Sequence, residues 1–116
     1  MTKPSKSAPP EMLQGTLDML VLRTLAAGAA HGHTIAKIIE RGSGDFLQVE
    51  QGSLYPALYR LEDRALVASF WGTTENNRKA KYYRLTPSGR KHLAVETSRW
   101  EQMVRAIGGI LYPAAE

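Results

Sequence analysis

Four side chains that can bind a polyanion lie close together in the middle of this sequence: Ser53, Tyr55, Tyr59 and Arg60. A hydroxyl, two phenols and a guanidinium can all form hydrogen bonds with phosphate oxygens or base edges. A basic segment follows between Gly72 and Leu85, where Glu75 alone opposes four cations: Arg78, Lys79, Lys81 and Arg84. Hydrogen-bonding side chains beside concentrated positive charge are typical of a surface that binds nucleic acid.

A helix is expected to position the first group. Leu54, Leu58 and Leu61 recur at helical spacing, which predicts an inward stripe on a helix that begins near residues 50–53 and ends near Arg64. Pro56 is expected in the first turn, where a missing amide hydrogen costs little. Six side chains then face outward, with the arginine as the best candidate for a charged groove contact: Ser53, Pro56, Ala57, Tyr59, Arg60 and Asp63.

After this helix the pattern changes to that of strands. Residues 66–71 and 81–85 are rich in β-branched or aromatic side chains, and the polar residues 72–80 between them predict a hairpin turn. A groove-entering helix followed at once by a basic hairpin is the element order of a winged helix-turn-helix, in which the hairpin contacts the DNA backbone or the minor groove. The expected DNA contacts are Ser53, Tyr55, Pro56, Tyr59, Arg60, Asn76, Asn77, Arg78, Lys79 and Lys81.

Three of these assignments have alternatives that the sequence leaves open. Ser53 can be the N-cap of its helix, a role compatible with a phosphate contact because a helix start itself attracts anions. Tyr55 can be a mostly buried ring whose hydroxyl is satisfied internally. The basic hairpin, taken alone, can be a solvated loop.

A further helix is expected before the helix that carries Ser53 and Arg60. His31, Gly32 and His33 lead into it, with Thr34 as its candidate cap, and glycines 42 and 44 end it. Its inward stripe is predicted to be Ile35, Ile38 and Ile39.

The first and last helices carry more apolar surface than one small core can cover. Residues 11–27 have two apolar stripes, and residues 86–111 begin with Thr86 as cap and Pro87 at the first helical position. The excess predicts a second subunit. The expected dimer contacts are Met12, Leu13, Leu17, Leu93, Trp100, Met103, Val104 and Ile107.

Trp100 has two candidate roles on the last helix. A tryptophan on such a stripe is usually an anchor of a dimer core. If the paired helices leave a gap, facing Trp100 rings could instead hold a flat aromatic ligand.

Composition limits the function classes. The length of 116 residues fits one domain. The formal net charge of +4 fits a polyanionic partner, and the absence of cysteine fits the reducing cytoplasm. No window approaches the ~20 apolar residues of a membrane span. His92 and Glu96 are expected to form a surface pair and not a metal site. No set of residues predicts a catalytic centre, and neither a metal nor a cofactor is expected.

Together these patterns predict an α+β, mainly α fold. Residues 1–10 are expected to be a disordered basic tail and not a signal peptide, residues 11–86 a winged helix-turn-helix DNA-binding domain, and residues 87–112 a C-terminal dimerisation helix.

Three motifs carry a family resemblance: Leu20–Leu25 followed by His31-Gly32 and Ile35, the run GSLYPAL of residues 52–58 with Arg60-Leu61-Glu62, and the run YYRLTPSG of residues 82–89. With these motifs the chain resembles the PadR family of bacterial transcriptional regulators, in its short subgroup with one C-terminal helix. It departs from the family in having His33 where an aromatic residue is common. It also has residues 76–80 (NNRKA) where the wing often carries a Gly-Arg-Pro run.

The resemblance implies a homodimer, closed by the first and last helices, that binds a palindromic operator and usually represses the adjacent gene. It also implies that a small aromatic effector held between the subunits can release some members from DNA. We therefore expect a dimeric, sequence-specific DNA-binding repressor, not an enzyme, that acts on a nearby gene or operon and can respond to a ligand. The alternative is a winged-helix module that binds an acidic protein and no DNA.

Overall fold

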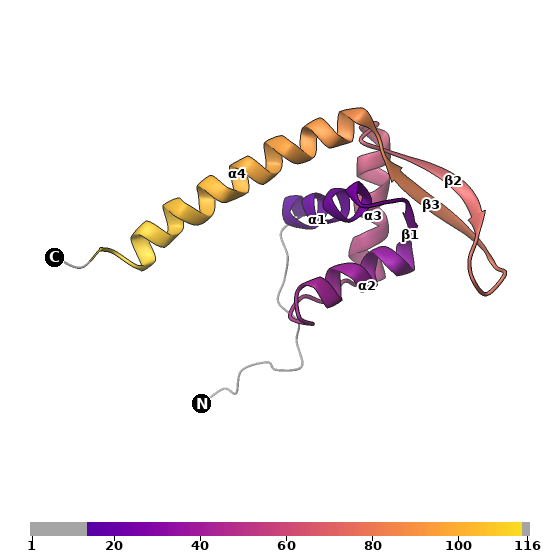
Figure 1. Cartoon of the computed structure of the whole chain (residues 1–116), viewed down its shortest axis with the longest axis horizontal. Coiled ribbons are helices and arrows are strands. Elements are labelled where there is room, and N and C mark those ends of the chain that lie inside the picture. The colour runs from indigo at the N-terminus through magenta and orange to yellow at the C-terminus, as the bar shows by residue number, and fades with distance from the viewer. Residues whose placement is uncertain (1–13, 115–116) are drawn as a thin grey trace.

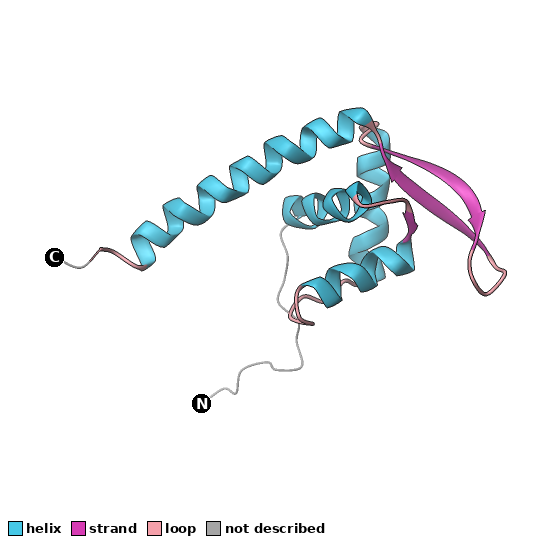
Figure 2. Cartoon of the chain, viewed as in Figure 1, coloured by secondary structure: helices cyan, strands magenta, loops and turns pink. Residues whose placement is uncertain are grey.

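The computed structural model describes residues 14–114. Its elements in chain order are α1 (Gln14–Ala26), β1 (Ala30–His31), α2 (Gly32–Gly42), α3 (Gln51–Asp63), β2 (Val67–Thr73), β3 (Lys79–Leu85) and α4 (Pro87–Leu111). Three helices pack together, a hairpin projects from one side, and α4 extends away on the other (Figure 1). Helices predominate over the small sheet (Figure 2), so the expected mainly α winged-helix class is confirmed.

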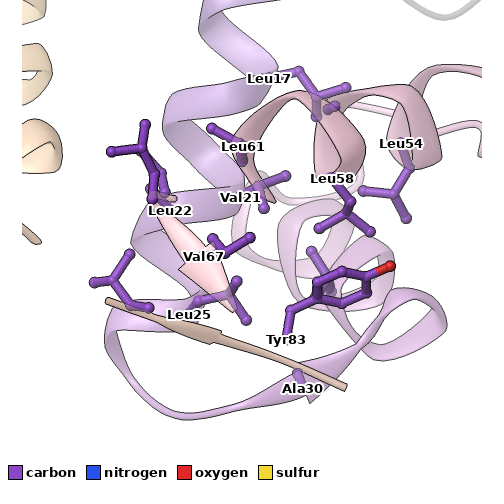
Figure 3. Close-up of a cluster of buried hydrophobic side chains, with 14 of the residues drawn as sticks. Leu17, Val21, Leu22, Leu25, Ala30, Leu54, Leu58, Leu61, Val67 and Tyr83 are labelled. Carbon is purple, nitrogen blue, oxygen red and sulfur yellow. The ribbon is translucent and has the colours of Figure 1, made fainter. Parts of the chain in front are cut away.

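The core lies where α1 and α3 face each other. Leu54, Leu58 and Leu61 are buried there, as their spacing predicted, against Leu17, Val21, Leu22 and Leu25 of α1. Figure 3 shows these side chains converging, with Val67 and Tyr83 of the sheet closing one side. The inward stripe of α3 therefore fixes which of its residues remain on the surface.

The sheet has the strand order β1-β3-β2 and is antiparallel throughout. Its first strand was not predicted. Ala30 and His31 pair with Tyr83 and Tyr82, but a strand of two residues is too short to show a period-2 pattern in sequence.

The hairpin turn is shorter than the predicted span of residues 72–80. The Thr74 amide donates to the Arg78 carbonyl oxygen at 2.8 Å, which leaves a loop of three residues, Glu75, Asn76 and Asn77. Asn77 has φ of +61°, a left-handed conformation that asparagine tolerates better than most residues and that three-residue hairpin loops need at this position. The backbone conformation of this turn therefore accounts for an asparagine at residue 77.

The start of α4 agrees with its prediction. The Thr86 Oγ1 accepts a hydrogen bond from the Gly89 amide at 2.9 Å and donates to the carbonyl oxygens of Ala65 and Leu66, while Pro87 takes the first helical position. A Cβ on Gly89 would lie 2.0 Å from the Leu66 carbonyl oxygen. The first turn of α4 is therefore pressed directly onto the junction between α3 and β2.

Two expectations about α3, and the N-cap alternative for Ser53, were wrong. The helix begins at Gln51 after Glu50, so Pro56 lies in the second turn and Ser53 lies inside the first turn, not at the N-cap. A proline there leaves the Gly52 carbonyl oxygen without the amide that an ordinary residue 56 would supply. Ala57, expected to face outward, is completely buried because it lies beside Leu58 and Leu61 on the inward stripe.

Two expectations about α2 were also wrong. Ile38 is 46% exposed, whereas Ile35 and Ile39 are buried, so the side of α2 that faces the core is narrower than predicted. Thr34 is not the cap, since His31 occupies that position, and the Thr34 hydroxyl oxygen lies 3.1 Å from the His31 Nε2.

No helix within residues 14–114 is long and apolar enough to cross a membrane.

Candidate nucleic-acid interface

The exposed part of α3 contains three of the residues predicted to read DNA. Ser53 and Pro56 are exposed near the start of the helix, and Tyr59 is 59% exposed one turn further on. All three lie opposite the leucine stripe, so packing of that stripe in the core leaves them available to a groove. A hydroxyl, an apolar ring and a phenol on one face can contact both phosphates and base edges.

Arg60 is engaged within the protomer. Its Nη2 donates to the Oδ1 of Asp18 in α1 at 2.8 Å, and its Nε lies 3.5 Å from the Oδ2 of the same carboxylate. The guanidinium therefore connects α3 to α1. A contact of Arg60 with DNA remains a prediction. Asp18 was missed in the sequence; the available signal was a single carboxylate within an apolar helix.

Tyr55 packs between the two helices of the helix-turn-helix. Its ring is half-buried against the core, and a Cβ on Gly32 would lie 2.7 Å from the Tyr55 hydroxyl oxygen. A side chain at residue 32 would therefore require the Tyr55 ring to shift. The half-buried ring agrees with the internal alternative, but its hydroxyl forms no hydrogen bond within residues 14–114, so a DNA contact of that hydroxyl stays a prediction.

A buried phenol lies beneath this surface. Burial, and secondarily the charge of Glu62 and the neighbouring phenols of Tyr59 and Tyr55, raise the pKa of Tyr83 above its ordinary value of 10.0. Tyr83 therefore stays neutral at physiological pH and acts as a packing group.

Glu62 joins α3 to both strands of the hairpin, a role that the sequence did not reveal. Its Oε2 accepts from the Ser69 hydroxyl of β2 at 2.5 Å, and its Oε1 lies 3.8 Å from the Lys81 Nζ of β3. Lys81, predicted to contact DNA, is therefore partly neutralised by a carboxylate of α3.

The tip of the hairpin has a different electrostatic character. Asn76, Asn77, Arg78 and Lys79 are all exposed, and no ion pair within residues 14–114 includes Arg78 or Lys79. Their positive charge is thus available to an anionic partner, at the end of an element that projects from the body of the protein (Figure 1).

His33, where the family commonly has an aromatic residue, belongs to a row of rings on the outer face of the sheet. It stacks parallel to His31 at 6.4 Å between centroids, His31 meets Tyr82 edge-on at 5.2 Å, and Tyr82 stacks with Phe70 at 5.6 Å. An imidazole therefore takes part in the same kind of contact as a larger aromatic ring.

The predicted dimer contacts divide into three groups. Leu17 and Leu93 are buried in the core of their own protomer, so intramolecular packing accounts for them and they are not available to a second subunit. Met12 and Leu13 lie outside the described residues, as does the predicted tail of residues 1–10. Four large side chains remain half exposed on α4: Trp100, Met103, Val104 and Ile107.

The pair His92–Glu96 was predicted to be a surface pair. The Nε2 and Oε2 of these residues are 3.7 Å apart, and Arg99 joins the same carboxylate at 3.2 Å. Within residues 14–114 no group of three or more histidine, aspartate or glutamate side chains could hold a metal ion.

Comparison with known proteins agrees with this geometry. Residues 21–95 match the model of the family described as "Transcriptional regulator PadR-like family". The chain is similar to Transcriptional regulator Rv3488 of Mycobacterium tuberculosis, with 28% identity over 85% of this chain and 89% of the relative.

Two solved structures extend the similarity to three dimensions. A PadR family transcriptional regulator from Eggerthella lenta is 32% identical with a TM-score of 0.72, covering 87% of this chain and 86% of the other. The smu.1704 protein of Streptococcus mutans is 26% identical with a TM-score of 0.79, covering 94% and 96%.

Proposed function

Since this chain belongs to the PadR-like family of transcriptional regulators, we propose that it is a cytoplasmic homodimer that binds a palindromic operator and represses a nearby gene or operon. The observation that carries the proposal is the exposed face of α3, with Ser53, Pro56 and Tyr59, beside a hairpin whose tip presents Arg78 and Lys79 without ion-pair partners among the described residues.

The division of labour follows from the geometry. The N-terminal half of a recognition helix reads base edges in the major groove, while a basic wing binds phosphates or the minor groove. Here Ser53, in the N-terminal half of α3, is the proposed base contact and the Tyr59 hydroxyl a proposed phosphate contact, with Asn76, Asn77, Arg78 and Lys79 on the backbone. Tyr55, Arg60 and Lys81 are the remaining proposed DNA contacts. Each of these side chains also makes a contact within the protomer, with Gly32, Asp18 and Glu62 respectively.

The dimer is inferred from α4. Trp100, Met103, Val104 and Ile107 fall on one side of a helix that extends beyond the domain, and each is 46% to 51% exposed. Pairing of two such helices would remove this apolar surface from water. A symmetric dimer with recognition helices about 34 Å apart would read two half-sites one DNA turn apart, which is the reason to expect a palindrome.

The same interface is the proposed site for a small aromatic effector. Trp100 is 48% exposed, so its ring is available to a planar ligand held between two subunits. A ligand there acts on DNA binding by favouring one spacing of the two recognition helices.

An electrophoretic shift against the promoter of the protein's own operon tests the proposal. We expect a retarded complex whose affinity falls steeply with salt and far exceeds that for a scrambled duplex of equal length. Binding to an acidic protein partner with no shift of any duplex, and with Ser53 and Arg60 dispensable, would instead identify the chain as a winged-helix interaction module.

A further inference from the structure

Trp71 is the most exposed large aromatic side chain of the sheet. It lies near the outer end of β2 and is 68% exposed, although tryptophan is usually largely buried in folded domains. Within the described residues its ring has no aromatic or cation–π partner. The nearby Phe70, by contrast, stacks on Tyr82 on the opposite face of the sheet. The exposure of Trp71 therefore requires its own explanation.

The strand register decides which way Trp71 faces. Alternate residues of a strand share a face, so Trp71 lies on the same face as Ser69 and Val67. Val67 is buried against the core, and Ser69 donates to Glu62 of α3. This face of the hairpin is thus the one turned toward the recognition helix. Trp71 continues it outward, where the hairpin projects beyond α3 (Figure 1).

The neighbours of Trp71 on this face are cationic. Lys81 is its direct cross-strand partner, and Lys79, which pairs with Thr73, is its diagonal neighbour. Lys81 is partly offset by Glu62 at 3.8 Å, whereas no ion pair within residues 14–114 includes Lys79. A flat apolar ring beside two ammonium groups matches one kind of partner, a strand of alternating sugars and phosphates. An apolar pocket on another protein would leave the Lys79 charge without a partner and would desolvate Lys81, which Glu62 offsets only in part.

We propose that Trp71 packs against the deoxyribose of an operator strand at the edge of the minor groove, while Lys79 and Lys81 bind the phosphates on either side. The contact rests on the proposed DNA-binding function and adds to it an apolar anchor in the wing. Since a sugar carries no sequence information, Trp71 contributes affinity that is independent of sequence and, unlike the lysines, independent of salt.

Fluorescence measures this contact directly, because the chain contains two tryptophans, Trp71 and Trp100. In the Trp100→Phe variant the emission reports Trp71 alone. Titration with the promoter duplex that the intact protein shifts should change that emission and protect it from acrylamide quenching. The matched Trp71→Phe variant, which keeps only Trp100, supplies the control for changes at the C-terminal helix.

Affinity supplies a second measurement that does not depend on Trp100. Trp71→Ala is expected to weaken binding about tenfold to operator and scrambled duplexes alike, with an unchanged dependence on salt. Phe70→Ala, which removes the adjacent ring from the opposite face, should change affinity less than about twofold.

The outcomes separate the two claims. A protein that shifts its promoter duplex while Trp71 remains fully open to acrylamide, or while Trp71→Ala binds as tightly as Phe70→Ala, retains its DNA-binding function but lacks this contact. A protein that shifts no duplex contradicts the proposed function itself, and the Trp71 contact with it.

Discussion

The Arg60 Nη2 lies 2.8 Å from the Asp18 Oδ1, so the recognition helix is joined to α1 by an ion pair that is largely shielded from water. The carboxylate side chain is 16% exposed and the guanidinium 33%. Arg60 thereby holds α3 against a helix that also packs on α4. In the proposed dimer, α1 and this pair therefore connect α4 to the face of α3 that is proposed to bind DNA.

Asp18→Asn should lower the free energy of unfolding by about 1 to 2 kcal/mol, because it weakens a partly buried charged hydrogen bond. Urea unfolding of Asp18→Asn, Arg60→Gln and the double variant measures the coupling between the two side chains. Asp63→Asn removes a similar but exposed charge from α3 and should change stability by less than about 0.5 kcal/mol. Strictly additive effects of the two substitutions would show that the pair contributes nothing.

Arg78→Ala with Lys79→Ala should flatten the dependence of DNA affinity on salt, because each lost phosphate contact reduces the slope of log K against log salt by about 0.9. The folded protein should be unaffected, since both side chains are exposed. Binding measured at several salt concentrations checks the slope. Arg105→Ala, on the C-terminal helix, is the control for simple loss of positive charge. A slope equal to that of the unmodified protein would exclude the wing tip from the interface.

Gly89→Ala should destabilise the protein by about 3 kcal/mol or more, because its Cβ would lie 2.0 Å from the Leu66 carbonyl oxygen and the backbone on both sides would have to move. Ser88→Ala, one residue earlier and exposed, should cost less than about 0.5 kcal/mol. Thermal unfolding monitored by circular dichroism distinguishes the two. Equal melting temperatures would mean that α4 does not dock on the junction of α3 and β2 as described.

The elements that could be predicted from sequence are those with a repeated local signal. Leu54, Leu58 and Leu61 gave the inward face of α3, and Thr86 with Pro87 gave the start of α4. Pro56 was misplaced because the true start of α3 depends on Glu50, whose side chain makes no capping hydrogen bond. Neither the spacing nor the residue type marks such a start.

Contacts between distant elements could not be predicted. Asp18 and Arg60 are far apart in the chain and meet only because α1 and α3 share a core, and the same holds for Glu62 with Ser69 and Lys81. The sequence therefore predicts DNA-binding residues but does not indicate which of them are held by partners inside the fold. Arg60, the best charged candidate in sequence, is the clearest example.

The raised pKa of Tyr83 predicts a loss of stability in alkaline solution. Below pH 10.0 the phenol is neutral in both the folded and the unfolded chain, so its contribution is fully present. Above pH 10.0 the unfolded chain loses its proton first, and stability declines as the pH approaches the higher pKa of the folded state. Tyr83→Phe should remove this part of the decline, whereas Tyr112→Phe, which changes an exposed phenol, should not. Urea unfolding between pH 8 and about pH 11 gives the comparison. Equal alkaline losses in the two variants would contradict the burial of the Tyr83 hydroxyl.

Ile107→Glu should convert the proposed dimer to a monomer, because it introduces a charge at the centre of the apolar side of α4, where Ile107 is 46% exposed in the single protomer. Gln102→Glu adds the same charge on the opposite side of the helix and should leave the dimer intact. Sedimentation measures the mass of each variant. Since two half-sites are bound together only by a dimer, Ile107→Glu should also weaken operator binding by at least about 100-fold, with little effect on binding to a single half-site. If Ile107→Glu remains dimeric, the exposed stripe of α4 does not hold the subunits together, and the spacing of the two recognition helices must be set elsewhere.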